Sequence, residues 1–212
     1  IKERLKSQAP TILYGCGDLG IIQKKGFAVV GSRKVDENLR NYTLDIGAIV
    51  AKSDLALISG GARGIDQSAM NGALRNGGKV VGVTADSLEK TVLSTGSREA
   101  LHDKMLLLLC PYDPSAGFNV GNAMQRNKVI YALSDAALIV NVEYKKGGTW
   151  NGAVEQLNKY NQIPLFVRTG EGDQKGCLGL IELGAINWEP PDNSLSLIDF
   201  INRKGAETSS IP

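Results

Sequence analysis

The chain has no marked excess of charge of either sign and no long apolar run. Its 212 residues carry 24 Lys plus Arg against 22 Asp plus Glu, a formal net charge of +2. No global basic field therefore attracts a polyanion, and any nucleic-acid site must be local. No stretch approaches the roughly 20 apolar residues that a membrane span needs. We therefore expect no membrane partner.

Cysteine and histidine are too few and too scattered for a metal centre. Cys16, Cys110 and Cys177 stand far apart without CxxC spacing, which argues against a metal cluster and against a disulfide framework. We interpret them as buried free thiols in a reducing cytoplasm. His102 is the only histidine, and its acidic neighbours favour a solvated helix end over a catalytic triad. The N-terminus lacks the plan of a signal peptide. We predict a cytoplasmic protein without a metal or a cofactor.

Apolar runs alternate with helical stretches through most of the chain. Six runs are predicted to be strands, namely 27–30, 55–59, 79–84, 105–110, 136–141 and 163–167. Four stretches carry apolar residues at helical spacing, namely 37–51, 65–75, 119–133 and 149–160. The runs are continuously apolar rather than alternating, which is typical of parallel strands buried on both faces. The rhythm predicts an α/β fold with a doubly wound, mainly parallel sheet.

Three regions are expected along the chain: an N-terminal preface (1–25), a main domain (26–190), and a C-terminal helix and tail (191–212). In the preface, 9–14 is a strand candidate, 15–18 a turn, and 19–24 a short helical stretch. Two consecutive prolines end the main domain before a last amphipathic helix at 194–202. The tail 208–212 is predicted to be disordered.

Two loops rich in glycine and arginine are the most informative motif. Each joins an expected strand to an expected helix, and their residues are Gly31, Ser32 and Arg33 in the first loop and Ser59, Gly60, Gly61, Arg63 and Gly64 in the second. Such a junction exposes unpaired backbone N–H groups at the helix N-terminus, where the dipole also favours an anion. The arginine of each loop adds a positive charge. Together the loops predict a phosphate site, although the first alone fits a plain turn equally well. Asp66 is expected to cap the helix or to pair with Arg63.

Two further segments repeat this chemistry. Their residues are Arg126, Asn127 and Lys128 on the third expected helix, and Gly147, Gly148 and Thr149 before the fourth. Arg126 and Lys128 fit a solvated face or, because cations near a helix start need an anion, a ligand site. Thr149 is a plausible N-cap. Right-handed crossovers bring the loops after parallel strands to one edge of the sheet, so we expect a single site.

The order of these motifs resembles that of the bacterial DNA-processing protein A family, also called DprA or Smf. The resemblance covers roughly residues 9 to 168 and is carried by the strings at 30–33, 59–66 and 126–130 and by the lead-in at 10–18. It implies an extended Rossmann-like fold that binds single-stranded DNA and forms a homodimer. It also implies protection of incoming DNA and help in loading a RecA-type recombinase during transformation or recombination.

Carried over by position, the resemblance places Arg33 and Arg63 against DNA phosphates. Lys128 and the 147–149 loop would flank the pocket. The chain departs from the family at Met70, where a histidine is usual, and at Lys128, where an arginine is usual. The loop before the fourth expected helix also differs from the usual Ser-Gly form.

Few aromatic side chains near these loops are placed to stack on bases. Trp150 and Tyr112 are the candidates, and helix packing explains Trp150 equally well. Because phosphate contacts read no bases, we expect weak sequence preference.

An enzyme is the main alternative. The segment 124–155 also resembles lysine-decarboxylase-like nucleoside-monophosphate phosphoribohydrolases, whose Gly-Gly-x-Gly-Thr-x-x-Glu loop ends in a catalytic glutamate. This chain has Gly152 there, and Glu155 lies about 4.5 Å further along the helix axis. Acid–base chemistry requires hydrogen-bond reach to the reacting atom, so we favour binding over catalysis and assign no catalytic residue. A nucleotide-binding regulatory module is a third alternative, because these loops would hold any phosphate.

Overall fold

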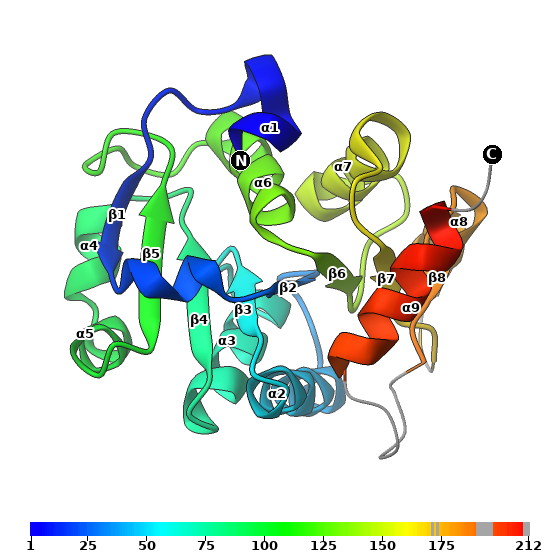
Figure 1. Ribbon diagram of the computed structural model, residues 1–212, viewed down its shortest axis with the longest axis horizontal. Coiled ribbons are helices and arrows are strands. Elements are labelled where there is room, and N and C mark those ends of the chain that lie inside the picture. The colour runs from blue at the N-terminus through cyan, green and yellow to red at the C-terminus, as the bar shows by residue number, and fades with distance from the viewer. Residues whose placement is uncertain (171, 173, 190–196, 210–212) are drawn as a thin grey trace.

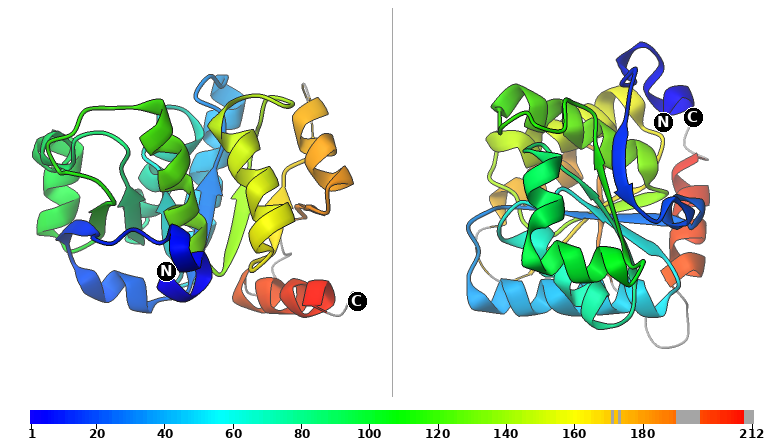
Figure 2. Two further views of the ribbon diagram at one scale, coloured as in Figure 1. Left: turned by 90° about the horizontal axis from the view of Figure 1, so that it is seen from above. Right: turned by 90° about the vertical axis from the view of Figure 1, so that its left-hand side faces the viewer.

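The computed structural model, which describes residues 1–170, 172, 174–189 and 197–209, has a mixed sheet between two layers of helices (Figures 1 and 2). Its strands are β1 (Tyr14–Gly17), β2 (Gly26–Val30), β3 (Ala56–Ser59), β4 (Lys79–Val83), β5 (Leu106–Cys110), β6 (Ala136–Ile139), β7 (Leu165–Val167) and β8 (Ile186–Asn187). They are ordered β1-β5-β4-β3-β2-β6-β7-β8. β1 is antiparallel to β5, and the other neighbouring pairs are parallel. The predicted doubly wound, mainly parallel α/β sheet is confirmed.

Helices connect these strands and cover both faces of the sheet. They are α1 (Lys2–Leu5), α2 (Glu37–Lys52), α3 (Ile65–Arg75), α4 (Leu88–Leu93), α5 (Thr95–His102), α6 (Val120–Leu133), α7 (Gly147–Glu155), α8 (Lys175–Glu182) and α9 (Leu197–Ser209). Short 3₁₀ helices occupy Lys6–Gln8 and Leu19–Gln23, and a π-helical turn at Gln156–Tyr160 continues α7. Two core clusters lie on opposite faces of the sheet. In β2, Phe27 and Val29 belong to one cluster and Ala28 and Val30 to the other, which explains the continuous apolar run.

Two glycines let α2 and α3 approach each other closely. A Cβ atom added to Gly72 would lie 2.1 Å from the backbone oxygen of Leu44. One added to Gly47 would lie 2.2 Å from the backbone oxygen of Ala69. The two helix backbones are therefore packed without side chains between them at this crossing.

The strand in the N-terminal preface lies further along the chain than predicted. The strand predicted at 9–14 is wrong except for its last residue, because β1 occupies Tyr14–Gly17, where we expected a turn. Tyr14 lies opposite Cys110 in the antiparallel pair. A Cβ atom at Gly17 would lie 2.2 Å from the backbone oxygen of Leu106, so close packing against β5 requires glycine. The helical stretch that follows is confirmed as a 3₁₀ helix.

Several elements were missed, and the C-terminal helix is longer than predicted. α1, α4, α5, α8 and β8 were not predicted. α9 extends to Ser209, so disorder at 208–209 was wrong, while 194–196 and 210–212 lie outside the described residues. His102 is the last residue of α5, where it is exposed and lies 3.1 Å from Asp103, as expected for a solvated helix end. The division into three regions stays a prediction.

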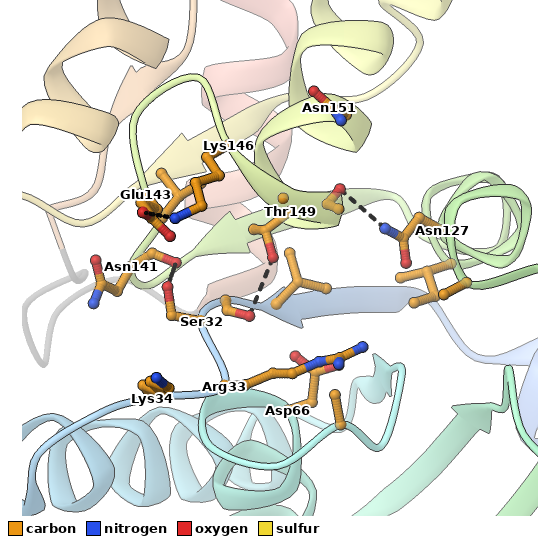
Figure 3. A pocket seen from close by; sticks show the side chains of 18 of the residues that line it. Ser32, Arg33, Lys34, Asp66, Asn127, Asn141, Glu143, Lys146, Thr149 and Asn151 are labelled. Atoms are coloured by element: carbon orange, nitrogen blue, oxygen red, sulfur yellow. Dashed lines mark hydrogen bonds and ion pairs between the residues drawn. The ribbon is translucent and has the colours of Figure 1, made fainter. Parts of the chain in front are cut away.

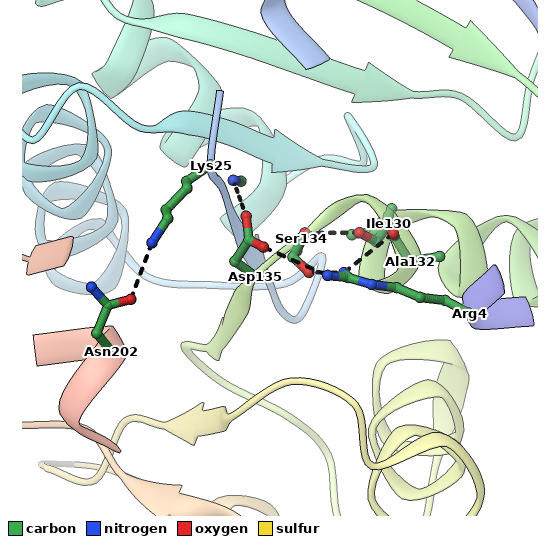
Figure 4. A network of polar contacts seen from close by, with 8 residues as sticks. Arg4, Lys25, Ile130, Ala132, Ser134, Asp135 and Asn202 are labelled. Carbon is green, nitrogen blue, oxygen red and sulfur yellow. Dashed lines mark hydrogen bonds and ion pairs between the residues drawn. The ribbon is translucent and has the colours of Figure 1, made fainter. Parts of the chain in front are cut away.

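The N-terminal helix is fastened to the C-terminal end of α6 (Figure 4). The guanidinium of Arg4 donates hydrogen bonds to the backbone oxygens of Ala132 and Ser134 and lies 3.5 Å from Asp135. Asp135 in turn accepts a hydrogen bond of 2.8 Å from the N–H of Gly26. Lys25, the next residue toward the N-terminus, donates a hydrogen bond to α9. Arg4 thus satisfies carbonyl groups that a helix end leaves without partners.

The three thiols differ in exposure, which predicts selective labelling. Cys110 and Cys177 are buried and Cys16, on the edge strand β1, is partly exposed. Burial also raises the pKa of the Cys110 thiol, which lowers its thiolate fraction. We expect a thiol reagent such as DTNB to modify Cys16 rapidly in the native chain and the other two only after denaturation. Rapid native labelling that persists in Cys16→Ser would contradict this.

Candidate phosphate-binding site

A cavity of about 1010 Å³ opens at the carboxyl edge of the sheet, beside β2 and β6 (Figure 3). The strand order reverses between these strands, and ligands of open α/β sheets bind at such a switch point. Residues of the 31–34 loop, the 141–149 segment and α6 line it. The expectation that remote motifs meet at one edge is therefore met for the first and fourth motifs and, through Arg126 and Asn127, for part of the third.

Hydrogen bonds join the loop after β2 to the segment after β6 (Figure 3). The N–H of Ser32 donates to the backbone oxygen of Asn141 at 3.0 Å. The hydroxyl of Thr149 donates to the backbone oxygen of Gly31 at 3.1 Å. Thr149 was expected to cap its helix, but α7 begins two residues earlier and Lys146 is at the N-cap. The hydroxyl instead links the two loops that form the cavity.

The second glycine loop supports the first loop. Gly64 has a φ of 84°, and a Cβ atom there would lie 2.5 Å from the backbone oxygen of Ser32. Ser59 is fully buried and its hydroxyl donates to β2 at 2.6 Å. A Cβ atom at Gly60 would lie 2.3 Å from the guanidinium of Arg126. Ser59, Gly60 and Gly64 therefore pack the strand ends together, and none of them is among the residues that line the cavity.

The outer part of this second loop is open to solvent. Gly61 has a φ of 67°, and a Cβ atom there would have no neighbour within 4 Å among the described residues. Arg63 is exposed and does not line the cavity. It directly precedes Gly64, so it lies beside the first loop. The predicted pairing of Asp66 with Arg63 is replaced by a buried partner.

That partner is Arg126, whose side chain is buried within the protein. It donates hydrogen bonds to the backbone oxygens of Gly60 and Val83, at the ends of β3 and β4. Asp66 is also buried and accepts a hydrogen bond of 3.1 Å from the N–H of Gly60. Burial raises the pKa of Asp66 and lowers the pKa of Arg126, and in each case the charge of the other residue opposes the effect. Arg126, predicted to contact phosphate, holds two strand ends together.

Asn127 and Lys128, which follow Arg126 on α6, point in different directions. The side-chain amide of Asn127 lines the cavity and donates to the backbone oxygen of Gly148 at 3.1 Å. Lys128 lies away from the cavity, with its Nζ 3.4 Å from Glu155 and 3.2 Å from Gln8. Glu155 also lies 3.5 Å from the ammonium group of a neighbouring lysine. The glutamate that the phosphoribohydrolase alternative needs is therefore engaged in ion pairs and does not line the cavity.

The cavity is moderately basic. Its lining contains five basic residues, Arg33, Lys34, Arg126, Lys146 and Arg168, and three acidic ones, Asp36, Asp66 and Glu143. Lys146 is paired with Glu143 at 2.8 Å, and Arg126 faces Asp66. Arg33, Lys34 and Arg168 remain for a ligand, and Arg168 packs 4.8 Å from the ring centroid of Tyr42. Sequence reasoning missed Arg168, although it directly follows β7 at the same edge as the motif loops.

An apolar rim lies beside Arg33. Phe118, Val120 and Met124 line the cavity and are 48%, 68% and 43% exposed. The guanidinium carbon of Arg33 lies 5.3 Å from the centroid of the Phe118 ring, within the range of a cation–π contact. An exposed aromatic ring beside free cations is the arrangement with which proteins stack single-stranded bases.

The two aromatic residues that we predicted for stacking have other roles. Trp150 is buried and packs edge-on against Tyr144, with ring centroids 5.1 Å apart. The hydroxyl of Tyr112 donates to the backbone oxygen of Asn122 at 2.7 Å. The packing role of Trp150 is thus the correct alternative, and Phe118 replaces both residues as the stacking candidate.

The described residues contain neither a candidate metal cluster nor a candidate membrane span. There, no group of three or more His, Cys, Asp or Glu side chains is placed to hold a metal ion. In the same part of the chain, no helix is long and apolar enough to cross a membrane.

The fold and the cavity define a doubly wound α/β protein with a basic site at its switch point. The family model described as DNA recombination-mediator protein A matches residues 2–199, and the chain belongs to this family. The family predicted from the loop motifs is therefore confirmed.

The relatives found by sequence are longer than this chain. It is 29% identical over 183 residues to DNA processing protein DprA of Streptococcus pneumoniae, an alignment that covers 84% of this chain and 63% of that protein. It is 27% identical over 185 residues to Protein Smf of Synechocystis, covering 83% and 46%. The chain thus spans about half to two thirds of these relatives.

Solved structures agree with the family. A structure of DNA processing protein A from Helicobacter pylori, studied for its single-stranded DNA binding mode, matches with a TM-score of 0.73 and 25% identity. The match covers 93% of this chain and 88% of that one. A molybdenum cofactor binding protein from Rippkaea orientalis matches with a TM-score of 0.58 and 18% identity, covering 84% and 98%. The second likeness shows the fold alone.

Proposed function

We propose that the chain binds single-stranded DNA in the switch-point cavity as part of DNA processing and recombination. The observation that carries this proposal is that Arg33, Lys34 and Arg168 line the same cavity as the exposed ring of Phe118, on which Arg33 packs. The Helicobacter relative with the same fold binds single-stranded DNA, which supports the same ligand here. The net charge of +2 over the whole chain is consistent with a local site.

Each part of the cavity has a separate task in this proposal. The planar guanidinium groups of Arg33 and Arg168 hold phosphate oxygens through paired hydrogen bonds. The free N–H groups at the start of α7 add donors to the same backbone. A base stacks on Phe118, which accepts any base because every base has a π-face. We therefore expect a site that follows the strand and reads little sequence.

The salt dependence of binding tests this division of tasks. Three phosphate contacts predict a log–log slope of affinity against salt near −2 for oligo-dT. Arg33→Ala is expected to make that slope shallower by about 0.7. Phe118→Ala is expected to weaken binding by about 1–3 kcal/mol with an unchanged slope, because it removes stacking without removing charge. Fluorescence anisotropy titrations at several salt concentrations measure both quantities.

Lys128→Ala is the matched control for Arg33→Ala, because it removes a cation that lies outside the cavity. Its affinity for oligo-dT should equal that of the wild type. A wild-type slope near zero, or unchanged affinity in Arg33→Ala, would contradict the proposed site. Free base released from nucleoside monophosphates and lost in Glu155→Gln would instead support the enzyme alternative.

The finer parts of the proposal concern partners. We infer that the chain acts as a homodimer, protects incoming DNA and passes the bound strand to a RecA-type recombinase. The family description, DNA recombination-mediator protein A, supports a role in recombination. The rate of RecA filament formation on single-stranded DNA, with and without the chain, tests the transfer, and sedimentation analysis tests the dimer.

A further inference from the structure

A second, shallower groove lies between α2 and α3. Its volume is about 330 Å³, with Arg40 and Asn41 of α2 on one side and Ser68, Asn71 and Arg75 of α3 on the other. The groove exists because the glycine contacts described above bring the two helix backbones close together, so that only the outward-facing side chains border it. Most of these side chains end in hydrogen-bond donors.

The groove carries two exposed cations. Arg40 and Arg75 are exposed, and neither forms an ion pair with another residue in the described part of the chain. Glu37 is the one acidic residue of the groove lining. Two guanidinium groups across a narrow groove fit the oxygens of consecutive phosphates better than they fit a neutral ligand.

The groove begins where the cavity ends. Lys34 and Asp36 line the cavity, whereas Val35 and Glu37 line the groove. The first turn of α2 borders both, because Asn38 and Leu39 line the cavity and Glu37 and Arg40 line the groove. A chain of phosphates that leaves the cavity past Lys34 therefore meets Arg40 next.

We infer that this groove holds the sugar-phosphate backbone of the DNA strand after it leaves the cavity. The inference rests on the proposed function and extends it from one site to a track. The groove lining contains no aromatic residue, so the bases of this second segment point to solvent and are not read. The cavity fixes the strand by stacking and charge, and the groove adds charge and hydrogen bonds alone.

Oligonucleotides of two lengths separate the groove from the cavity. A short oligo-dT of about 5 nucleotides fills one site, and one of about 20 nucleotides reaches both. The double variant Arg40→Ala/Arg75→Ala is expected to bind the long strand on the order of tenfold more weakly, with a salt slope shallower by about 1.4. Its affinity for the short strand should not change. Glu37→Gln should strengthen binding of the long strand only.

Matched variants keep the result interpretable. Arg98→Ala/Arg203→Ala removes two exposed arginines that border neither site and should bind both strands like the wild type. Arg40→Lys/Arg75→Lys keeps the charge and should retain most of the long-strand affinity. Thermal melting of each variant checks that α2 and α3 are intact.

The outcomes separate this inference from the proposed function. Suppose that the wild type binds both lengths and that Arg40→Ala/Arg75→Ala binds the long strand equally well. This result overturns DNA binding in the groove and is still compatible with DNA binding in the cavity. If that variant melts normally but loses the same affinity for both lengths, the groove is not a separate binding segment and the inference is also overturned. If the wild type binds neither strand, the proposed function fails and the groove fails with it.

Discussion

Replacing Arg126 by alanine is expected to lower the free energy of unfolding by about 3–5 kcal/mol. The change leaves the buried carboxylate of Asp66 without its opposite charge and removes the donors to Gly60 and Val83. Urea denaturation followed by tryptophan fluorescence measures the loss, because Trp150 and Trp188 are both buried. Gln125→Ala is the control on the same helix, since this neighbouring side chain is exposed, and it should change stability by less than about 0.5 kcal/mol.

A second substitution separates the effect of the unpaired charge on stability from the effect of the lost hydrogen bonds. In the Arg126→Ala background, Asp66→Asn removes the unpaired charge and should restore part of the lost stability. No recovery would mean that the loss comes from the missing backbone hydrogen bonds alone. Because Arg126 supports the fold, a loss of DNA binding in an Arg126 variant can be interpreted only after the stability of that variant has been measured.

The loss of folding stability in Arg126→Ala also depends on pH. Burial already raises the pKa of Asp66, and without the guanidinium that pKa rises further. The folded variant then binds a proton more tightly than its unfolded chain does. Its stability relative to the wild type is therefore highest below the ordinary Asp pKa of about 3.9 and falls as pH rises through the folded pKa. Denaturation at pH 5 and pH 8 checks this sign, and the deficit should be larger at pH 8.

Gly72→Ala is expected to destabilise the fold by about 3 kcal/mol, because the added methyl group would overlap a backbone atom. The nearest atom, the backbone oxygen of Leu44 at 2.1 Å, belongs to α2 and cannot rotate away. For a chain of this size the loss corresponds to a fall in melting temperature of roughly 6–12 °C. Thermal denaturation followed by circular dichroism measures it.

Gly96→Ala is the matched control. This glycine also lies in a helix, α5, but an added Cβ atom has no neighbour within 4 Å among the described residues. Helix propensity alone predicts that both substitutions stabilise the protein by up to about 1 kcal/mol. Opposite signs for Gly72→Ala and Gly96→Ala support the backbone contact, and a stabilised Gly72→Ala would refute it.

The parallel strands in the centre of the sheet could be predicted from the sequence, and the edge strands and short helices could not. The runs that became β2 to β7 are continuously apolar because residues on both faces are buried, and that pattern is visible in sequence. β1 was misplaced because its glycines read as a turn, whereas Gly15 and Gly17 serve close packing against β5. The short elements α4 and β8 carry too few residues for a periodic signal.

The placement of the predicted site residues agrees with the structure in part, and helix geometry explains the differences. The loops at Gly31 and Gly147 meet as expected, since strand topology fixes where they lie. Arg126, Asn127 and Lys128 were treated as one unit, but consecutive residues of an α-helix point in different directions. Arg126 is buried in the wall of the cavity, Asn127 lines the cavity and Lys128 faces Glu155. Phe118 and Arg168 lie in no motif, so only their placement at the switch point reveals them.

The buried position of Arg126 changes what its motif means. The side chain joins the ends of β3 and β4 and compensates the buried carboxylate of Asp66 at the wall of the cavity. A match to the Arg-Asn-Lys string therefore identifies an architecture of strand ends and says nothing about the molecule bound above them. The choice of ligand depends instead on cavity residues that make no strand-end contacts, such as Arg33, Phe118 and Arg168.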